Sequence, residues 1–378
     1  MSLGIYIHLP FCRVHCAYCP FAVSTDLTLQ EAYIGALIRE IESAPEGEDV
    51  DTIFFGGGTP SRTAPEHLER IVDALRRRFR IRDDAEFSIE ANPEDVAPEA
   101  IAFWRSLGVN RLSIGVQSFH DAELQPIGRI HGAARARQAI RDAVAFGPSP
   151  GPAAPARPLP AGEVRTSIDL ILGLPNQTAD SFRASLAEAI ASGIGHVSIY
   201  MLDLDEDTAL RRRVEAGVVQ LPDEETIAAL YVEMVTTLRD AGFAQYEISN
   251  FARDGEESRH NLRYWLRRHY RGFGLGAHSF IGERRFANTR DIGKYIDGNV
   301  YDFMEELSDV ERRHELVFLR LRQAAGIDGD ELRRLCGEEA DTWIEHGVSE
   351  GWLHRNGSRV AFTPAGFLVS SELISQLF

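Results

Sequence analysis

The stretch FCRVHCAYCPF (residues 11–21) places Cys12, Cys16 and Cys19 within eight positions, although the chain of 378 residues has only four cysteines. Thiolates are soft ligands that suit zinc and iron-sulfur clusters. A redox dithiol would need only two of the three thiols. A structural zinc ion would need a fourth ligand, for which two nearby histidines are candidates. A four-iron cluster held by three thiolates leaves one iron without a protein ligand. The pattern favours a cluster, and zinc stays open as the alternative.

Six short β-rich runs alternate with stretches of helical period along the first part of the chain. Such alternation predicts right-handed βαβ units and a parallel sheet. Six units predict a partial TIM-like (β/α)6 barrel, an α/β fold whose site lies at the carboxyl ends of the strands. The runs are GIYIHL (4–9), DTIFFG (51–56), EFSIEA (86–91), RLSIGV (111–116), TSIDLILG (166–173) and HVSIYML (196–202).

The length predicts more than one domain, because single cores usually stop growing below this size. We expect the barrel over residues 1–225, an extension with the motif HNLRYW over 226–304, and a small domain over 305–378. The last segment reads as two helices and a hairpin with Asn356-Gly357 at its turn, which predicts an α+β winged-helix-like domain. The segment 147–163, rich in Pro and Gly, predicts a loop.

Composition excludes several classes of protein. A net charge of -17 disfavours binding to nucleic acid, even though winged helices often bind DNA. The sequence has no run of eighteen apolar residues, so no transmembrane helix is predicted. The N-terminus shows no basic leader or cleavage site, which predicts a cytoplasmic protein. A disulfide framework is a poor explanation for cysteines in that reducing compartment.

Polar residues follow several of the predicted strands. GGGTPS (56–61) comes directly after the second run, where glycines let a ligand approach the backbone closely. Glu90 and Gln117 end the third and fourth runs, Arg129 follows in GRIHG, and Asp169 lies in the fifth run. Each alone is typical of a capping or ion-paired residue. Together, at successive strand ends, they favour a ligand site.

The pattern CxxxCxxC on a loop after the first strand resembles the signature of the radical SAM superfamily. YIHLPFC, GGGTPS, EANP, RLSIGVQSF, GRIHG, DLILGLPNQT, HNLRYW and GLGAHSF resemble, in this order, the group that contains oxygen-independent coproporphyrinogen III oxidases and HemW-type haem chaperones. The resemblance covers nearly the whole chain. It implies a [4Fe-4S] cluster whose open iron binds S-adenosylmethionine.

The resemblance also implies the residues of this cofactor site. Cys12, Cys16 and Cys19 would hold the cluster. Asp203, after the sixth run, is a weaker candidate for the nucleoside pocket by position alone. The residues implied to contact S-adenosylmethionine are Tyr6, Tyr18, Gly57, Gly58, Thr59, Glu90, Gln117, Arg129 and Asp169.

Two features separate the chaperones from the oxidases. The cysteine motif of known oxidases resembles CxxxCxxCxC, whereas Phe21 stands here at the place of the last cysteine. The chain also starts almost at its first strand, without the longer N-terminal segment of the oxidases. HNLRYW resembles an HNxxYW motif associated with haem handling, so that His260 is a candidate iron ligand and Tyr264 or Trp265 would cover a porphyrin. A buried aromatic cluster is the alternative.

The resemblance therefore favours a HemW-like haem chaperone that passes haem to recipient haemoproteins. The rival is an enzyme that oxidatively decarboxylates coproporphyrinogen III. In both cases the resemblance implies a small electron donor such as flavodoxin or ferredoxin.

Overall fold

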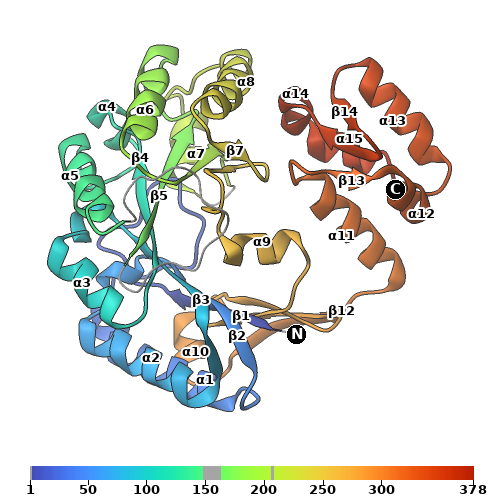
Figure 1. Cartoon of the computed structure of the whole chain (residues 1–378). Helices are drawn as coiled ribbons and strands as arrows, with labels where there is room; N and C mark the ends of the chain where they lie inside the picture. Colours follow the sequence, from blue (N-terminus) through green and yellow to red (C-terminus); the bar gives the residue numbers. More distant parts are fainter. Residues whose placement is uncertain (1, 148–162, 206–207) are drawn as a thin grey trace.

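The computed structural model describes residues 2–147, 163–205 and 208–378. Six parallel strands pair in chain order and form the curved sheet at the centre of Figure 1. All six predicted strands are confirmed, and they make a partial (β/α)6 barrel. The strands are β1 (Leu3–Leu9), β2 (Asp49–Gly57), β3 (Arg80–Ala91), β4 (Arg111–Gln117), β5 (Arg165–Leu172) and β6 (His196–Met201).

Helices between these strands cover the outer face of the sheet (Figure 1). They are α1 (Gln30–Ser43), α2 (Pro65–Arg78), α3 (Pro98–Ser106), α4 (Asp121–Leu124), α5 (Ala133–Val144) and α6 (Ala179–Ala191). The sequence patterns missed α3, a short helix that begins with proline at its first position. The short helix α4 ends at Leu124, because Pro126 has no N–H with which to continue the helical hydrogen bonds.

The sheet continues beyond the barrel on both sides, to twelve strands among the described residues. Next to β1 lies β9 (Tyr270–Phe273), followed by antiparallel β10 (His278–Ile281), β11 (Arg284–Asn288) and β12 (Tyr301–Glu306). Next to β6 lie two short antiparallel strands, first β8 (Asn250–Ala252) and then β7 (Ala244–Gln245). The helices of this region are α7 (Ala209–Glu215), α8 (Glu224–Asp240), α9 (Arg259–Trp265) and α10 (Ile292–Ile296).

The C-terminal segment forms helices around a small antiparallel sheet of order β13-β15-β14. The predicted hairpin is confirmed, with Gly357 at a φ of 62° in its turn. The second predicted helix is broken at Gly337, whose φ is 86°. The elements are α11 (Asp309–Leu321), β13 (Ile327–Asp328), α12 (Gly329–Cys336), α13 (Glu339–Ser349), β14 (Leu353–Asn356), β15 (Arg359–Phe362), α14 (Pro364–Leu368) and α15 (Ser370–Ser375).

Helix α9, which carries the HNLRYW motif, lies between the barrel strands and the C-terminal helices (Figure 1). Buried charges fix it. Glu86 on β3 accepts hydrogen bonds from the backbone N–H groups of Arg259, at 3.1 Å, and His260, at 2.9 Å. The same carboxylate pairs with Arg111 at 3.0 Å. Burial alone would raise the pKa of Glu86, but Arg111 and these N–H groups hold it below its ordinary value.

Two predictions about organisation are not tested by this architecture. The proposed boundaries after residues 225 and 304 stay predictions. The predicted loop at 147–163 lies, apart from its two end residues, outside the described part of the chain. No helix among the described residues is long and apolar enough to cross a membrane.

Candidate cofactor site

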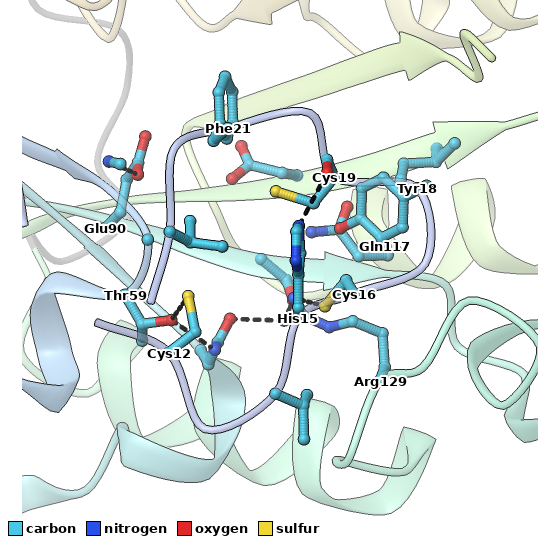
Figure 2. Close-up of a pocket in the computed structure, with 18 of the residues that line it drawn as sticks. Cys12, His15, Cys16, Tyr18, Cys19, Phe21, Thr59, Glu90, Gln117 and Arg129 are labelled. Atoms are coloured by element: carbon cyan, nitrogen blue, oxygen red, sulfur yellow. Dashed lines mark hydrogen bonds between the residues drawn. The ribbon is translucent and has the colours of Figure 1, made fainter. Parts of the chain in front are cut away.

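The three clustered cysteines lie on the loop that follows β1. This loop is fixed at its two ends, because Cys12 N–H donates to Ser24 O at 3.0 Å and Ser24 N–H donates to Pro10 O at 2.8 Å. The sulfurs of Cys12, Cys16 and Cys19 are not in disulfides, and all three residues line one cavity (Figure 2). The loop therefore brings three thiols from one short stretch to a common space.

Three thiols on one loop suit an iron-sulfur cluster, whereas a structural zinc ion would need a fourth ligand. Within the described residues, no group of three or more His, Cys, Asp and Glu side chains converges on a single ion position. A cluster instead needs one thiolate for each of several irons. The histidines near the loop are also engaged: His8 Nε2 lies 2.9 Å from Ala22 O, and His15 Nε2 lies 3.1 Å from Cys19 O.

Two side chains approach the cysteine sulfurs. The Thr59 hydroxyl lies 3.3 Å from the sulfur of Cys12, and Arg129 Nη1 lies 3.8 Å from that of Cys16. Hydrogen bonds to sulfur tune the potential of iron-sulfur clusters. Burial raises the pKa of Cys12 to about 11, so the thiol carries a proton that metal binding would displace.

The cavity beside the loop has a volume of about 400 Å³ and opens at the carboxyl ends of the strands. Small-molecule sites have volumes of roughly 300–1,000 Å³. Of the residues implied for the nucleoside pocket, all but Tyr6 line it. They are Tyr18, Gly57, Gly58, Thr59, Glu90, Gln117, Arg129, Asp169 and Asp203. Their contact with S-adenosylmethionine stays a prediction.

The glycines after β2 are needed for packing against the cysteine loop. A side-chain carbon on Gly58 would lie 2.6 Å from Pro10 O and 3.0 Å from the sulfur of Cys12. The Gly58 N–H donates to Leu9 O at 2.9 Å. The GGGTPS stretch therefore seats the loop as well as leaving backbone open at the cavity.

Asn92, in the motif EANP, is a site residue that the sequence reading missed. Its amide donates to Thr59 Oγ1 at 3.2 Å, and its Oδ1 accepts from Arg129 Nη2 at 2.6 Å. Asn92 thus joins the side chains that approach two of the sulfurs. Its position directly after β3, at the carboxyl end of a barrel strand, was the feature of the sequence that could have identified it as a site residue.

Gln117 adopts a strained backbone at the end of β4. Its φ is 65°, in the left-handed region that residues other than glycine rarely adopt, and the pairing of β4 with β5 shifts register there. Such strain, about 1–3 kcal/mol, persists where the surroundings hold it and clusters at functional sites.

Two carboxyl groups lie at the bottom of the cavity. Glu90 accepts from Gly57 N–H at 3.2 Å, and Asp169 accepts from the Ser113 hydroxyl at 3.1 Å. Burial, with the charge of Asp169 added, raises the pKa of Glu90 to about 8. Burial raises the pKa of Asp169 to about 6. Glu90 is therefore largely protonated at neutral pH when no ligand is present.

Sequence similarity agrees with this site. The radical SAM superfamily pattern matches residues 6–189. Heme chaperone HemW of Bacillus subtilis is 34% identical over 97% of both chains, and heme chaperone HemW of Mycobacterium tuberculosis H37Rv is 34% identical over 99% of this chain and 94% of its own. This chain belongs to the HemW family.

The fold of this HemW-family chain is also that of a solved relative. Coproporphyrinogen III oxidase (HemN) from Escherichia coli superimposes with a TM-score of 0.81, covering 100% of this chain and 90% of the oxidase, at 21% identity. At that identity the likeness shows a shared fold. It confirms the predicted radical SAM barrel with a small C-terminal domain.

Phe21 lies at the rim of the cofactor cavity of this HemW-family chain (Figure 2). It is 59% exposed. At this position the chain therefore presents an apolar ring and no thiol.

The HNLRYW side chains lie apart from the cysteines. His260 is 1% exposed, with Nδ1 2.9 Å from the Thr52 hydroxyl and Nε2 2.8 Å from the Tyr264 hydroxyl. His260 and Tyr264 line a second cavity, together with Tyr6. Trp265 lines neither of these two cavities, and its carbonyl accepts from Gln323 Nε2 at 3.1 Å.

Proposed function

We propose that this protein is a haem chaperone that binds a [4Fe-4S] cluster, S-adenosylmethionine and haem, and delivers haem to recipient haemoproteins. The observation that carries this proposal is the similarity, over nearly the whole length of both chains, to proteins named heme chaperone HemW. The radical SAM match and the three free thiols on one cavity support the two cofactors.

Cys12, Cys16 and Cys19 would hold the cluster in this proposal, and the cavity beside them would bind S-adenosylmethionine. Bound there, such a cluster supplies an electron and an open iron for the amino and carboxylate groups of the ligand. The chain would supply the open backbone of Gly57 and Gly58, the guanidinium of Arg129, and acceptors on Glu90 and Asp169. A small electron donor such as flavodoxin or ferredoxin, in the cytoplasm, belongs to the same proposal.

Phe21 supports the chaperone over the oxidase. An oxidase site resembling CxxxCxxCxC would have a thiol at the rim of the cavity, and Phe21 removes it. The exposed ring instead adds apolar surface beside the cavity, which suits a flat macrocycle.

The haem ligands remain predictions. His260, Tyr264 and Trp265 were the candidates from the HNxxYW motif, but both ring nitrogens of His260 have partners, Nδ1 the Thr52 hydroxyl on β2 and Nε2 the Tyr264 hydroxyl on α9 itself. Iron could reach His260 only after α9 gives up these hydrogen bonds.

The test uses anaerobically reconstituted protein and two reactions. Titration with haemin should saturate at about one haem per chain, the stoichiometry of a single haem site. The loaded protein should transfer haem to a haem-free haemoprotein faster than free haemin does. In parallel, the protein is incubated with coproporphyrinogen III, reductant and S-adenosylmethionine. Efficient conversion to protoporphyrinogen IX, or absence of stoichiometric haem binding, would overturn the chaperone proposal.

A further inference from the structure

A second cavity of about 240 Å³ lies inside the barrel. It shares Glu90, Asp169 and Tyr200 with the cofactor cavity, so these three residues form both the floor of the first cavity and the roof of the second. We call this second cavity the inner chamber. Whatever fills the inner chamber is in contact with the two carboxyl groups beneath the cofactor.

Serines on neighbouring strands make the chamber hollow. Ser113 on β4 is paired with Ser167 on β5, and Asp169 on β5 is paired with Ser198 on β6. Ser198 is in turn paired with Asn250 on β8. Bulky branched side chains usually fill these inward positions in a TIM-like barrel. Small hydroxyl side chains leave space and line it with hydrogen-bonding groups.

Helix α9 closes the chamber on the side away from the cofactor cavity. His260, Asn261 and Tyr264 of the HNLRYW motif all line it. Asn261 Nδ2 donates to Glu247 Oε1 at 3.2 Å, and the helix N-terminus is fixed by Glu86. Three of the residues that define the motif therefore face the space beneath the cofactor site.

The chamber has the properties of a hydrated cavity. Polar cavities with room for a water molecule and several hydrogen-bonding partners hold ordered water, whereas empty cavities are apolar. Tyr200, which lines both cavities, leaves 46% of its surface accessible. The roof and floor both offer donors and acceptors to such water.

We propose that the inner chamber is a binding site for a cluster of ordered water that connects α9 to Glu90 and Asp169, so that the HNLRYW residues position these two carboxyls for the cofactor. The inference rests on the proposed function for its cofactor, S-adenosylmethionine. It gives His260, Asn261 and Tyr264 a role as positioning residues that act through water, in place of a role as haem ligands.

The test removes one hydroxyl at each end of the chamber. Tyr264→Phe acts on the α9 side, and Ser113→Ala removes the hydrogen bond to Asp169. Tyr231→Phe is the matched control, because its hydroxyl is buried on α8 and donates to Ile248 O at 3.0 Å, away from the lining residues of the chamber. Iron content, haem stoichiometry and S-adenosylmethionine affinity are measured for each reconstituted protein.

We expect both chamber variants to bind S-adenosylmethionine about fivefold or more weakly, the lower end of usual couplings between sites. Iron content and haem stoichiometry should match those of the control variant. A high-resolution crystal structure of the unmodified protein should show water bridging the α9 side chains to Glu90 or Asp169.

A dry or collapsed chamber would overturn the inference. Unchanged S-adenosylmethionine affinity in both variants would also overturn it. Loss of haem binding in Tyr264→Phe alone would show that the HNLRYW motif binds haem and would overturn the positioning role. Failure of the unmodified protein to bind iron or S-adenosylmethionine would instead reject the proposed function, so the two failures are distinguishable.

Discussion

Arg129 lies beside Cys16, with its Nη1 3.8 Å from the cysteine sulfur. The other terminal nitrogen donates to Asn92 at 2.6 Å and to the carbonyl of Gly115 at 2.7 Å. These two hydrogen bonds fix a positive charge next to Cys16, one of the three proposed cluster ligands. Asn92, which follows β3, and Gly115 on β4 therefore set the position of the charge that Arg129 presents to the Cys16 sulfur.

Replacing this charge should change the potential of the bound cluster. A nearby positive charge favours the reduced, more negative cluster. We expect Arg129→Gln to lower the reduction potential by on the order of 100 mV, the size of a Coulomb interaction at about 6 Å with an effective dielectric of about 20. A redox titration followed by paramagnetic resonance measures it. Arg183→Gln, an exposed arginine on α6, is the control, and an equal potential in both variants would contradict the assignment.

Breaking the buried ion pair beneath α9 should destabilise the protein strongly. Glu86 and Arg111 have side chains that are 1% and 3% exposed. Loss of one partner leaves a buried charge without compensation, so Glu86→Gln should lower the free energy of unfolding by about 3–5 kcal/mol. Denaturant unfolding measures the change.

The control for that experiment is an exposed ion pair. Glu42 and Arg77 lie 3.3 Å apart with side chains 52% and 62% exposed. Glu42→Gln should change the free energy of unfolding by less than about 1 kcal/mol. Similar effects from both substitutions would show that α9 is not held by the buried pair.

The raised pKa of Glu90 predicts an unusual pH dependence. The folded state keeps the Glu90 proton up to a pKa of about 8, whereas the unfolded chain releases it near the ordinary value of 4.5. The stability contributed by this proton is complete below pH 4.5 and is lost as pH rises toward 8. Glu90→Gln, which stays neutral, should flatten this decline.

The measurement for Glu90 is denaturant unfolding of iron-free protein at several pH values between 5 and 9. The difference in unfolding free energy between Glu90→Gln and the unmodified protein should grow with pH over this range. A difference that is constant with pH would mean that Glu90 is ionised in the folded protein.

The sequence predicted the parts of this protein that follow from local pattern. Alternating apolar runs predicted β1 to β6, and the spacing of Cys12, Cys16 and Cys19 predicted three thiols on one loop. Helix α3 was missed because its nine residues are too few to show a clear helical period. The polar residues predicted at strand ends, Glu90, Gln117, Arg129 and Asp169, all line the cavity, since parallel strands end at one edge of the barrel.

What the sequence could not predict depends on register between distant segments. The serines that hollow the chamber face one another only through the pairing of β4, β5, β6 and β8. The motif HNLRYW predicted a histidine near aromatic rings, but its burial under Glu86 depends on contacts about 174 residues apart along the chain. Asn92 could be recognised only once Arg129 and Thr59 were placed beside it.

The central claim is that three cysteines hold a cluster with one iron open to S-adenosylmethionine. Paramagnetic resonance of the reduced, anaerobically reconstituted protein tests it most directly. The account predicts a cluster signal, about four irons per chain, that changes shape when S-adenosylmethionine is added. The signal should be absent in Cys16→Ala and kept in Cys336→Ala, whose thiol lies in the C-terminal segment. A zinc-filled protein without the signal, or a signal that S-adenosylmethionine leaves unchanged, would contradict the account.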